Sequence, residues 1–128
     1  MEPLSQTIND TFTDANRPLY EVKANLFKGL AHPVRIRVLE VLSGADEVSV
    51  ADLLADSELE ASHLSQHLAV LRKHNLVLAE RRQSQVFYRL AYPAVADLLS
   101  VARQLLGEIL AASQQHLDAL APVERLPR

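Results

Sequence analysis

The sequence contains no cysteine among its 128 residues. This absence excludes disulfides, thiolate metal sites and thiol redox switches, because each of them requires a cysteine sulfur. Glycine is also scarce, and Gly29, Gly44 and Gly107 are too dispersed to form a phosphate-binding loop. No run of about 18 apolar residues is present, so we expect no membrane-spanning helix. The N-terminus lacks the basic start and apolar middle of a signal peptide, and we therefore expect a cytoplasmic protein.

Charge is distributed unevenly along a chain whose net charge is −3. Residues 1–59 hold five basic and ten acidic residues, residues 60–90 hold five and two, and residues 91–128 hold three and four. The positive excess therefore lies in residues 60–90. A local basic surface on an acidic chain is compatible with phosphate binding, although a solvated charged hairpin would give the same pattern. The hydrophobic content of 48% is enough for one small core and a single compact domain.

The first half of the chain predicts two helices after a polar N-terminal segment. We expect residues 1–18 to form a flexible arm or a short helix. A helix should begin near Pro18 and end before Pro33, because proline disfavours helical geometry in the residue that precedes it. A second helix should run from about Pro33 to Leu42, with Gly44 ending it. The apolar positions at helical spacing are Leu19, Val22, Leu26, Phe27 and Leu30 in the first helix and Ile36, Leu39 and Leu42 in the second.

A helix-turn-helix is predicted next. Ser49 followed by Asp52 resembles a capping box, so a short third helix should begin there and end near Asp56. Residues 56–59 supply the turn. A fourth helix should span about residues 60–74, with Asn75 closing it in left-handed geometry and three leucines buried on one face: Leu64, Leu68 and Leu71.

A β-hairpin and a long last helix complete the chain. Two strands, Val77–Arg82 and Val86–Leu90, should flank Gln83, Ser84 and Gln85. From about residue 93 to residue 120, apolar residues form a stripe on a helix that is long for a domain of this size, so it should either pair with a partner or pack on its own domain. We therefore expect one DNA-binding and dimerisation domain at residues 19–120, with a tail at 121–128.

Three segments resemble the ArsR/SmtB family of bacterial winged helix-turn-helix regulators: LFKGLAHPVRIRVLEVL (26–42), SHLSQHLAVLRKHNLV (62–77) and RRQSQVFYRL (81–90). The resemblance covers roughly residues 19–110. It implies a mainly α fold with a two-stranded β-wing and a homodimer that pairs through its first and last helices. The dimer interface would then include Leu19, Val22, Leu26, Leu98, Ala102, Leu105 and Ile109. The resemblance also implies repression of an operator that is released when an effector binds.

The chain departs from the family pattern at three positions where many members carry glycine. These positions are Glu58, Asn75 and Ser84. Asparagine tolerates left-handed geometry, so Asn75 changes little. Ser84 at the tip of the wing implies a less tight turn there.

The fourth helix carries the residue types that read base edges in the major groove. Its first two turns hold Ser62, His63, Ser65, Gln66 and His67, and the resemblance places family contacts at Ser62, Ser65 and His67. Gln66 can pair with adenine through two hydrogen bonds, and the hydroxyls and imidazoles can meet several base edges. In the alternative interpretation, Ser62 caps the helix and His67 forms a hydrogen bond inside the domain.

Basic and polar residues that follow these turns should contact the DNA backbone. Arg72 and Lys73 lie two turns further along the same helix. In the wing, the candidates for a phosphate or the minor groove are Arg81, Arg82, Gln83, Ser84 and Gln85, of which Arg82 is the preferred one.

The sensor sites that the resemblance would supply are missing. Where many family sensors place cysteines near the third helix, this chain has Val48, Ser49, Val50 and Ala51. At the four positions of the last-helix metal site it has Tyr92, Ala94, Leu105 and Glu108, of which only Glu108 could bind a metal, whereas zinc needs four donors. We therefore expect no resident cofactor. An irregular nickel or zinc site at His116, with Asp118 or with Asp10 and Asp14, stays an alternative, and a small organic effector, a protein effector or none all remain open.

Three classes of function compete. The first is a homodimeric repressor that binds double-stranded operator DNA. The second is a winged-helix subunit that recruits another protein through the long last helix, but Ser65, Gln66 and Arg82 argue against it. The third is an enzyme, and we expect none. Ser65 and His67 are two residues apart on one helix and do not face each other, and no nucleophile elbow or metal-hydrolase motif is present.

Overall fold

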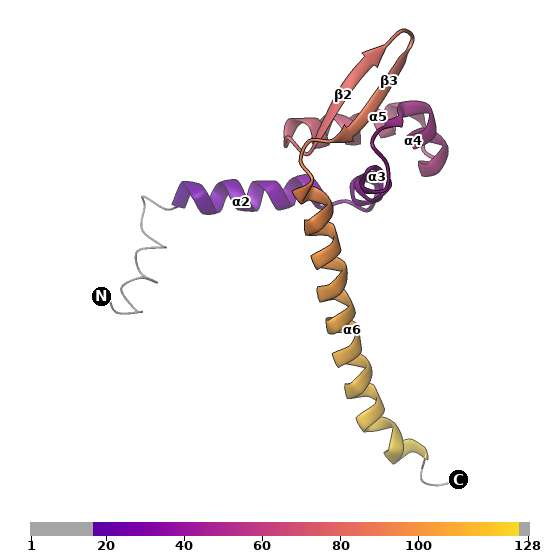
Figure 1. Ribbon diagram of the computed structural model, residues 1–128. Coiled ribbons are helices and arrows are strands. Elements are labelled where there is room, and N and C mark those ends of the chain that lie inside the picture. Colours follow the sequence, from indigo (N-terminus) through magenta and orange to yellow (C-terminus); the bar gives the residue numbers. More distant parts are fainter. Residues whose placement is uncertain (1–16, 126–128) are drawn as a thin grey trace.

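The structure is a computed structural model that describes residues 17–125, with side chains as far as residue 120. The elements follow the predicted order (Figure 1). Residues 1–16 of the predicted arm lie outside the described residues, and residues 17 and 18 belong to the first described helix. The elements are α2 (Arg17–Leu30), α3 (Pro33–Ser43), β1 (Val48–Ser49), α4 (Val50–Ser57), α5 (Ala61–Lys73), β2 (Val77–Arg82), β3 (Gln85–Leu90) and α6 (Ala94–Arg125).

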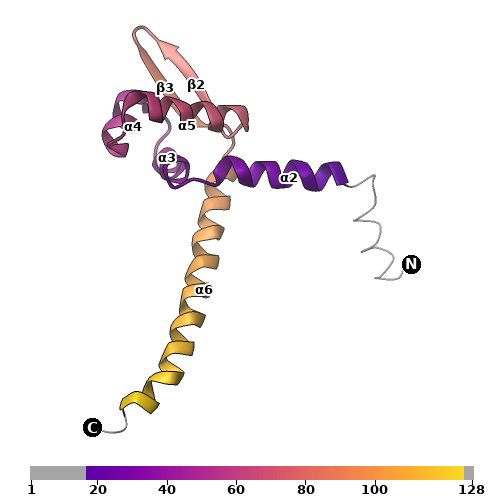
Figure 2. The same ribbon diagram turned by 180° about the vertical axis from the view of Figure 1, so that it is seen from behind.

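The molecule consists of a compact head from which two helices project. Helices α3, α4 and α5 pack together beside the small sheet, whereas α2 and α6 leave this head in different directions (Figures 1 and 2). Helix α6 continues to Arg125, across the expected start of the tail at residue 121. The projecting helices therefore present long surfaces that the other described residues do not cover.

Local signals in the sequence account for the boundaries of the helices in the head. Helix α3 begins at Pro33, and the His32 side chain caps it by accepting a hydrogen bond from the Val34 backbone N–H at 3.1 Å. Ser49 caps α4 by accepting a hydrogen bond from the Asp52 backbone N–H at 3.1 Å, as the capping-box pattern predicted.

Two turns in the head depend on left-handed residues. Glu58 ends α4 with a φ of 57°, and Asn75 follows α5 with a φ of 61°. Both positions are ones at which the family resemblance favours glycine. Asparagine adopts this geometry readily, as predicted for Asn75, whereas glutamate does so at a cost.

The wing is part of a three-stranded antiparallel sheet in the order β1-β3-β2. Strands β2 and β3 form the predicted hairpin, with Arg82 paired to Gln85. The prediction of two strands missed β1, in which Val48 pairs with Tyr88 and Ser49 with Phe87. A two-residue strand gives no alternating pattern that a sequence could reveal, because such a pattern needs about four residues or more.

The tip of the wing is tighter than Ser84 implied. Only two residues, Gln83 and Ser84, separate the paired residues Arg82 and Gln85. Gln83 has a φ of 58° and therefore takes the left-handed position itself. The expectation of a looser turn is wrong, because the strained residue is Gln83 and not Ser84.

The core lies between α3, α5 and the sheet. Leu39 and Leu71 are fully buried, and Leu42, Leu53 and Leu64 are 1% exposed. Leu68 is buried with them, so the predicted leucine stripe of α5 packs inward. Because this stripe faces the core, the opposite side of α5 must face outward. Ile36, which we expected on the buried face of its helix, is instead 41% exposed, while Val38 is buried.

Helix α6 contacts the head through residues 94–103, where its apolar residues enter the core and Arg103 forms an ion pair with Glu40 of α3 at 2.6 Å. Val95 and Leu99 are buried in the core, and Leu98 is partly buried against it. From residue 100 to residue 120 every side chain is exposed, including a series of large apolar ones: Val101, Leu105, Leu106, Ile109, Leu110, Leu117 and Leu120. The alternative in which this helix packs wholly on its own domain is therefore wrong.

No helix in the described part of the chain is long and apolar enough to cross a membrane.

Replacement of Glu58 by glycine should raise the free energy of unfolding by about 0.5–1 kcal/mol, because glycine removes the cost of a positive φ at this exposed position. Urea denaturation of the wild type and Glu58→Gly measures the change. Gly44→Ala is the matched comparison. Gly44 has a φ of −94°, and an added Cβ would lie 3.7 Å from the nearest atom, so alanine should also stabilise there. A loss of stability in Glu58→Gly would contradict this explanation.

Candidate nucleic-acid interface

The outer face of α5 carries polar side chains along its length, interrupted by one alanine. Ser62, Gln66, Ala69 and Lys73 follow one another at helical spacing and are all exposed. The other exposed predicted residues of this helix are His63, Ser65 and Arg72. Because Leu64, Leu68 and Leu71 hold the opposite face in the core, this arrangement presents hydroxyls, an amide and basic groups outward from a fixed helix.

Ser62 does not cap α5. Glu60 occupies the N-cap position, and its side chain makes no capping hydrogen bond. The alternative role for Ser62 as the cap is therefore wrong. The exposed Ser62 side chain lies at this helix start.

His67 points toward α3 and is only half-exposed. Its ring centroid lies 4.2 Å from that of His32, and its Nδ1 lies 3.4 Å from Nη1 of Arg35. Burial lowers the pKa of His67, and the neighbouring charges of His32, Arg35 and His63 lower it further. The internal hydrogen bond that the sequence left as an alternative for His67 is thus present.

The Arg82 side chain in the wing contacts two other residues, Phe87 of β3 and Glu47, which directly precedes β1. Its guanidinium forms an ion pair with the Glu47 carboxylate, and it lies 4.0 Å from the centroid of the Phe87 ring. The hydrogen bond to Glu47 raises the pKa of Arg82. A phosphate would have to compete with Glu47 for this group. Gln83, Ser84, Gln85 and Arg81 are exposed around the tip of the hairpin, as expected for wing contacts.

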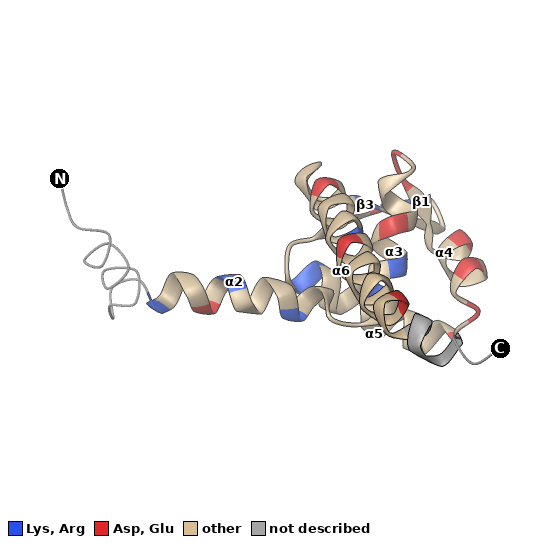
Figure 3. Ribbon diagram, turned by 90° about the horizontal axis from the view of Figure 1, so that it is seen from below, with Lys and Arg blue, Asp and Glu red and all other residues tan. Residues whose placement is uncertain are grey.

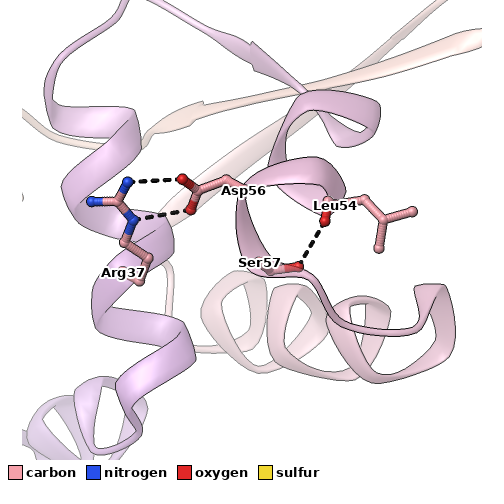
Figure 4. A network of polar contacts seen from close by, with 4 residues as sticks. All are labelled: Arg37, Leu54, Asp56 and Ser57. Atoms are coloured by element: carbon pink, nitrogen blue, oxygen red, sulfur yellow. Dashed lines mark hydrogen bonds and ion pairs between the residues drawn. The ribbon is translucent and has the colours of Figure 1, made fainter.

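A second ion pair joins α3 to α4, the first helix of the helix-turn-helix. Arg37 donates to both carboxylate oxygens of Asp56 at 2.8 and 3.0 Å, and Ser57 donates to the Leu54 carbonyl at 3.1 Å (Figure 4). The hydrogen bond from Arg37 lowers the pKa of Asp56. Because the Arg37 side chain is 61% exposed, this pair contributes little stability.

Acidic and basic residues are distributed unevenly over the helices. Helix α4 carries Asp52 and Asp56 and no basic residue, whereas α2 carries Arg17, Lys23 and Lys28 with one acidic residue (Figure 3). Helix α5 carries Arg72 and Lys73 and no acidic residue, although Glu60 stands at its N-cap and Glu80 lies in β2. The negative net charge is therefore compatible with a local basic surface on α5 and the wing.

The described residues contain no group of three or more histidine and acidic side chains that could hold a metal ion. His116 lies on the exposed part of α6, and Asp118 accepts a hydrogen bond from the Gln114 amide at 3.0 Å. Asp10 and Asp14, the other candidate ligands, lie outside the described residues.

The sequence did not identify several residues that shape this surface. Ala69 lies on the outer face between Gln66 and Lys73, and its spacing from Gln66 is the signal that could have found it. Glu47 and Arg35 contact Arg82 and His67 from elements distant in the sequence. No pattern within one segment reveals such contacts.

The fold and this surface define a winged helix-turn-helix DNA-binding protein. A family model described as a helix-turn-helix domain matches residues 30–79. The chain is 49% identical over 96 residues to the HTH-type transcriptional regulator Rv0081 of Mycobacterium tuberculosis, covering 74% of this chain and 83% of that protein. The crystal structure of Rv0081 matches with a TM-score of 0.71 at 47% identity, covering 75% of this chain and 96% of that one.

Other relatives carry more specific names. The biofilm growth-associated repressor of Agrobacterium fabrum is 37% identical over 73% of this chain and 76% of its own length. The transcriptional activator HlyU of Vibrio cholerae is 36% identical over 62% of this chain and 73% of its own length. The structure of the homodimeric winged helix-turn-helix domain of Mb0332 from Mycobacterium bovis matches with a TM-score of 0.68 at 26% identity. The match covers 75% of this chain and 88% of that one, and Mb0332 is described as a possible ArsR-family regulator. The chain belongs to the ArsR-like family of winged helix-turn-helix transcriptional regulators.

The lowered pKa of His67 predicts a loss of stability in mild acid. The folded state binds a proton at His67 more weakly than the unfolded state, so its contribution to stability is present above about pH 6.5, the ordinary histidine value, and is lost as the pH falls through the lower folded value. Urea denaturation at several pH values between about 7.5 and 5.5 measures the slope of the free energy of unfolding against pH. His67→Gln should flatten the slope. An equal slope in the variant and the wild type would contradict the assignment.

Proposed function

We propose that the protein is a homodimeric repressor that binds a two-fold symmetric operator, with α5 of each protomer in the major groove and the wing against the flanking DNA. The observation that carries the proposal is the exposed face of α5 from Ser62 to Lys73, polar apart from Ala69, on a helix whose opposite face is fixed in the core. A helix held in this way can place its first turns on base edges without loss of orientation.

Base contacts are assigned to the exposed residues of α5. Gln66 pairs with adenine, Ser62, Ser65 and His63 meet neighbouring base edges or phosphates, and the Ala69 methyl group suits a thymine methyl. Arg72 and Lys73 address the backbone at the end of the helix. His67 contributes to DNA binding only indirectly, because its ring is engaged with His32 and Arg35.

Wing contacts are assigned to Arg81, Arg82, Gln83, Ser84 and Gln85. Arg81 and the residues of the turn are exposed and can approach a phosphate directly. Arg82 reaches DNA by exchanging the Glu47 carboxylate for a phosphate oxygen, while Phe87 keeps the guanidinium in place.

Pairing of two chains is assigned to α2 and α6. Of the residues expected in the interface, Leu19, Val22, Ala102, Leu105 and Ile109 are exposed, and Leu26 and Leu98 are half-buried against their own core. Apolar surface of this extent on two projecting helices favours burial against a second copy. The homodimeric state of Mb0332 supports the same arrangement.

The regulator has no catalytic role in this proposal and resides with the chromosome in the cytoplasm. It uses no resident metal, because Glu108 is the one possible ligand among the four last-helix positions, and Tyr92, Ala94 and Leu105 offer no imidazole or carboxylate. Its effector is a small molecule, a protein or absent. Relatives are named both as repressors and as activators, so a promoter reporter with and without the gene decides the direction.

Gln66→Ala should relax the preference at one operator position and weaken operator binding by about 1–3 kcal/mol, because a paired contact to one base is lost. Arg82→Ala is the matched comparison. It should weaken binding to operator and random DNA alike and reduce the dependence on salt, because it removes a phosphate contact. Competition titrations with both DNAs at several salt concentrations separate the two effects. An equal loss on both DNAs for Gln66→Ala would contradict its role in base reading.

Leu105→Glu should weaken the dimer at least about 10-fold, because pairing would bury an uncompensated carboxylate. Sedimentation equilibrium measures the dissociation constant of the dimer. Gln104→Glu adds the same charge at the neighbouring exposed position on a polar side of α6 and should leave dimerisation nearly unchanged. If both variants stay as dimeric as the wild type, α6 does not form the interface.

A further inference from the structure

Helix α2 is attached to the head only near its C-terminal end. Gly29 and Leu30 are its buried residues, whereas the helix from Arg17 to Lys28 is exposed apart from half-buried Tyr20 and Leu26. The direction in which α2 leaves the head is therefore set by a short contact region at residues 26–30, which includes Leu26 packed against the core.

Arg35 of α3 holds this region through its guanidinium. Its Nε donates to the Gly29 carbonyl at 2.8 Å, and its Nη2 donates to the Lys28 carbonyl at 3.1 Å. The carbonyls of the last helical turn lack partners within their helix, and a cation is favoured at that end. One planar group thus fixes two backbone positions of α2.

The third nitrogen of the same guanidinium faces α5. Nη1 of Arg35 lies 3.4 Å from Nδ1 of His67, and the His32 ring packs against His67 on the side of α3. His67 directly follows Gln66, which lies on the outer face of α5. Arg35 therefore connects the end of α2 to the helix that carries the candidate base-reading side chains. We refer to Arg35 with its contacts to Lys28, Gly29 and His67 as the Arg35 joint.

A close approach of the backbone supports the same region from the other side. A Cβ added at Gly29 would lie 2.6 Å from Cγ of His74 and 2.9 Å from its Cβ. These atoms belong to the inner part of the His74 side chain, so they cannot move away as the end of a flexible chain would. Only glycine allows α2 to pass this close to the end of α5.

We propose that Arg35 is a positioning residue that fixes the angle between α2 and α5 and thereby sets the half-site spacing that the dimer accepts. The inference rests on the proposed function, since it requires α5 to read DNA and α2 to belong to the dimer interface. In a two-fold dimer the two reading helices are separated by a distance that depends on how each head is held relative to its dimer helix. Arg35 itself does not touch DNA.

The test compares binding to one half-site with binding to two. The DNAs are a duplex with a single half-site, the full operator, and operators whose spacing is changed by one or two base pairs. Wild-type protein should bind the full operator about 100-fold more tightly than the half-site, because the second contact is made at high effective concentration. Arg35→Ala should lose about 10-fold on the full operator, should change half-site binding less than about two-fold, and should discriminate less between spacings.

Two other arginine variants make the comparison specific. Arg35→Lys keeps the charge but cannot engage three acceptors in one plane, so it should resemble Arg35→Ala. Arg37→Ala removes another guanidinium of α3, one whose hydrogen bonds go to Asp56 of α4, and it should retain the spacing preference of the wild type. Equal losses on half-site and full operator for Arg35→Ala, or no loss on either, would overturn the proposal.

Gly29→Ala tests the same angle without altering Arg35. The added methyl group should displace α2 from His74 and shift the preferred spacing, while half-site binding stays within about two-fold of the wild type. An unchanged spacing optimum in a folded, dimeric Gly29→Ala protein would also overturn the proposal. Failure of the proposed function is distinguishable, because the wild type itself would then show no preference for the operator over random DNA.

Discussion

The burial of one leucine stripe determines what α5 can present to its surroundings. Leu64, Leu68 and Leu71 pack into the core against α3 and the sheet, and each of them is almost completely removed from solvent. A rotation of the helix about its axis would expose these leucines at a cost of about 1.5–3 kcal/mol each. The polar side chains from Ser62 to Lys73 therefore face outward for a reason that lies in the core, and their direction is fixed before any DNA is bound.

The chain divides into a head and two projecting helices because its apolar residues form only one small core. The head uses its leucines for one small core, and the first turns of α6 contribute Val95 and Leu99 to it. The remaining apolar residues of α2 and α6 have no core to enter and stay exposed. Under the proposed function these helices join two heads, and the Arg35 joint transmits their geometry to the reading helix.

Much of this architecture could be predicted from the sequence, because its signals are local. Pro33, the Ser49 cap, Asn75 and the leucine spacing of α5 each act within a few residues, and the structure confirms the helices and the hairpin that they predicted. The strand pattern on either side of Gln83 and Ser84 predicted the hairpin after α5, and the resemblance to the family implied the same two-stranded wing. Strand β1 was missed because two residues carry no pattern, and Ile36 was misplaced because three apolar positions fit the spacing of α3 on more than one face.

Contacts between distant segments could not be predicted in this way. The ion pair between Glu47 and Arg82 joins residues 35 positions apart, and the contact between Arg35 and His67 joins residues 32 positions apart. Both contacts change the roles that the sequence suggested. Arg82 is already paired with Glu47, and His67 is directed into the domain. Residue type identified the candidate surface, but only the packed structure separates the side chains that face outward from those that hold the helix.

The central claim is that two outward-facing α5 helices, held by one dimer, read DNA together. Selection of bound sequences from a random DNA pool with the purified full chain tests this claim most directly. The account predicts a two-fold symmetric consensus whose half-sites lie about one helical turn, roughly 10 base pairs, apart. A pool that stays random, or a single asymmetric site without a second half, would contradict it.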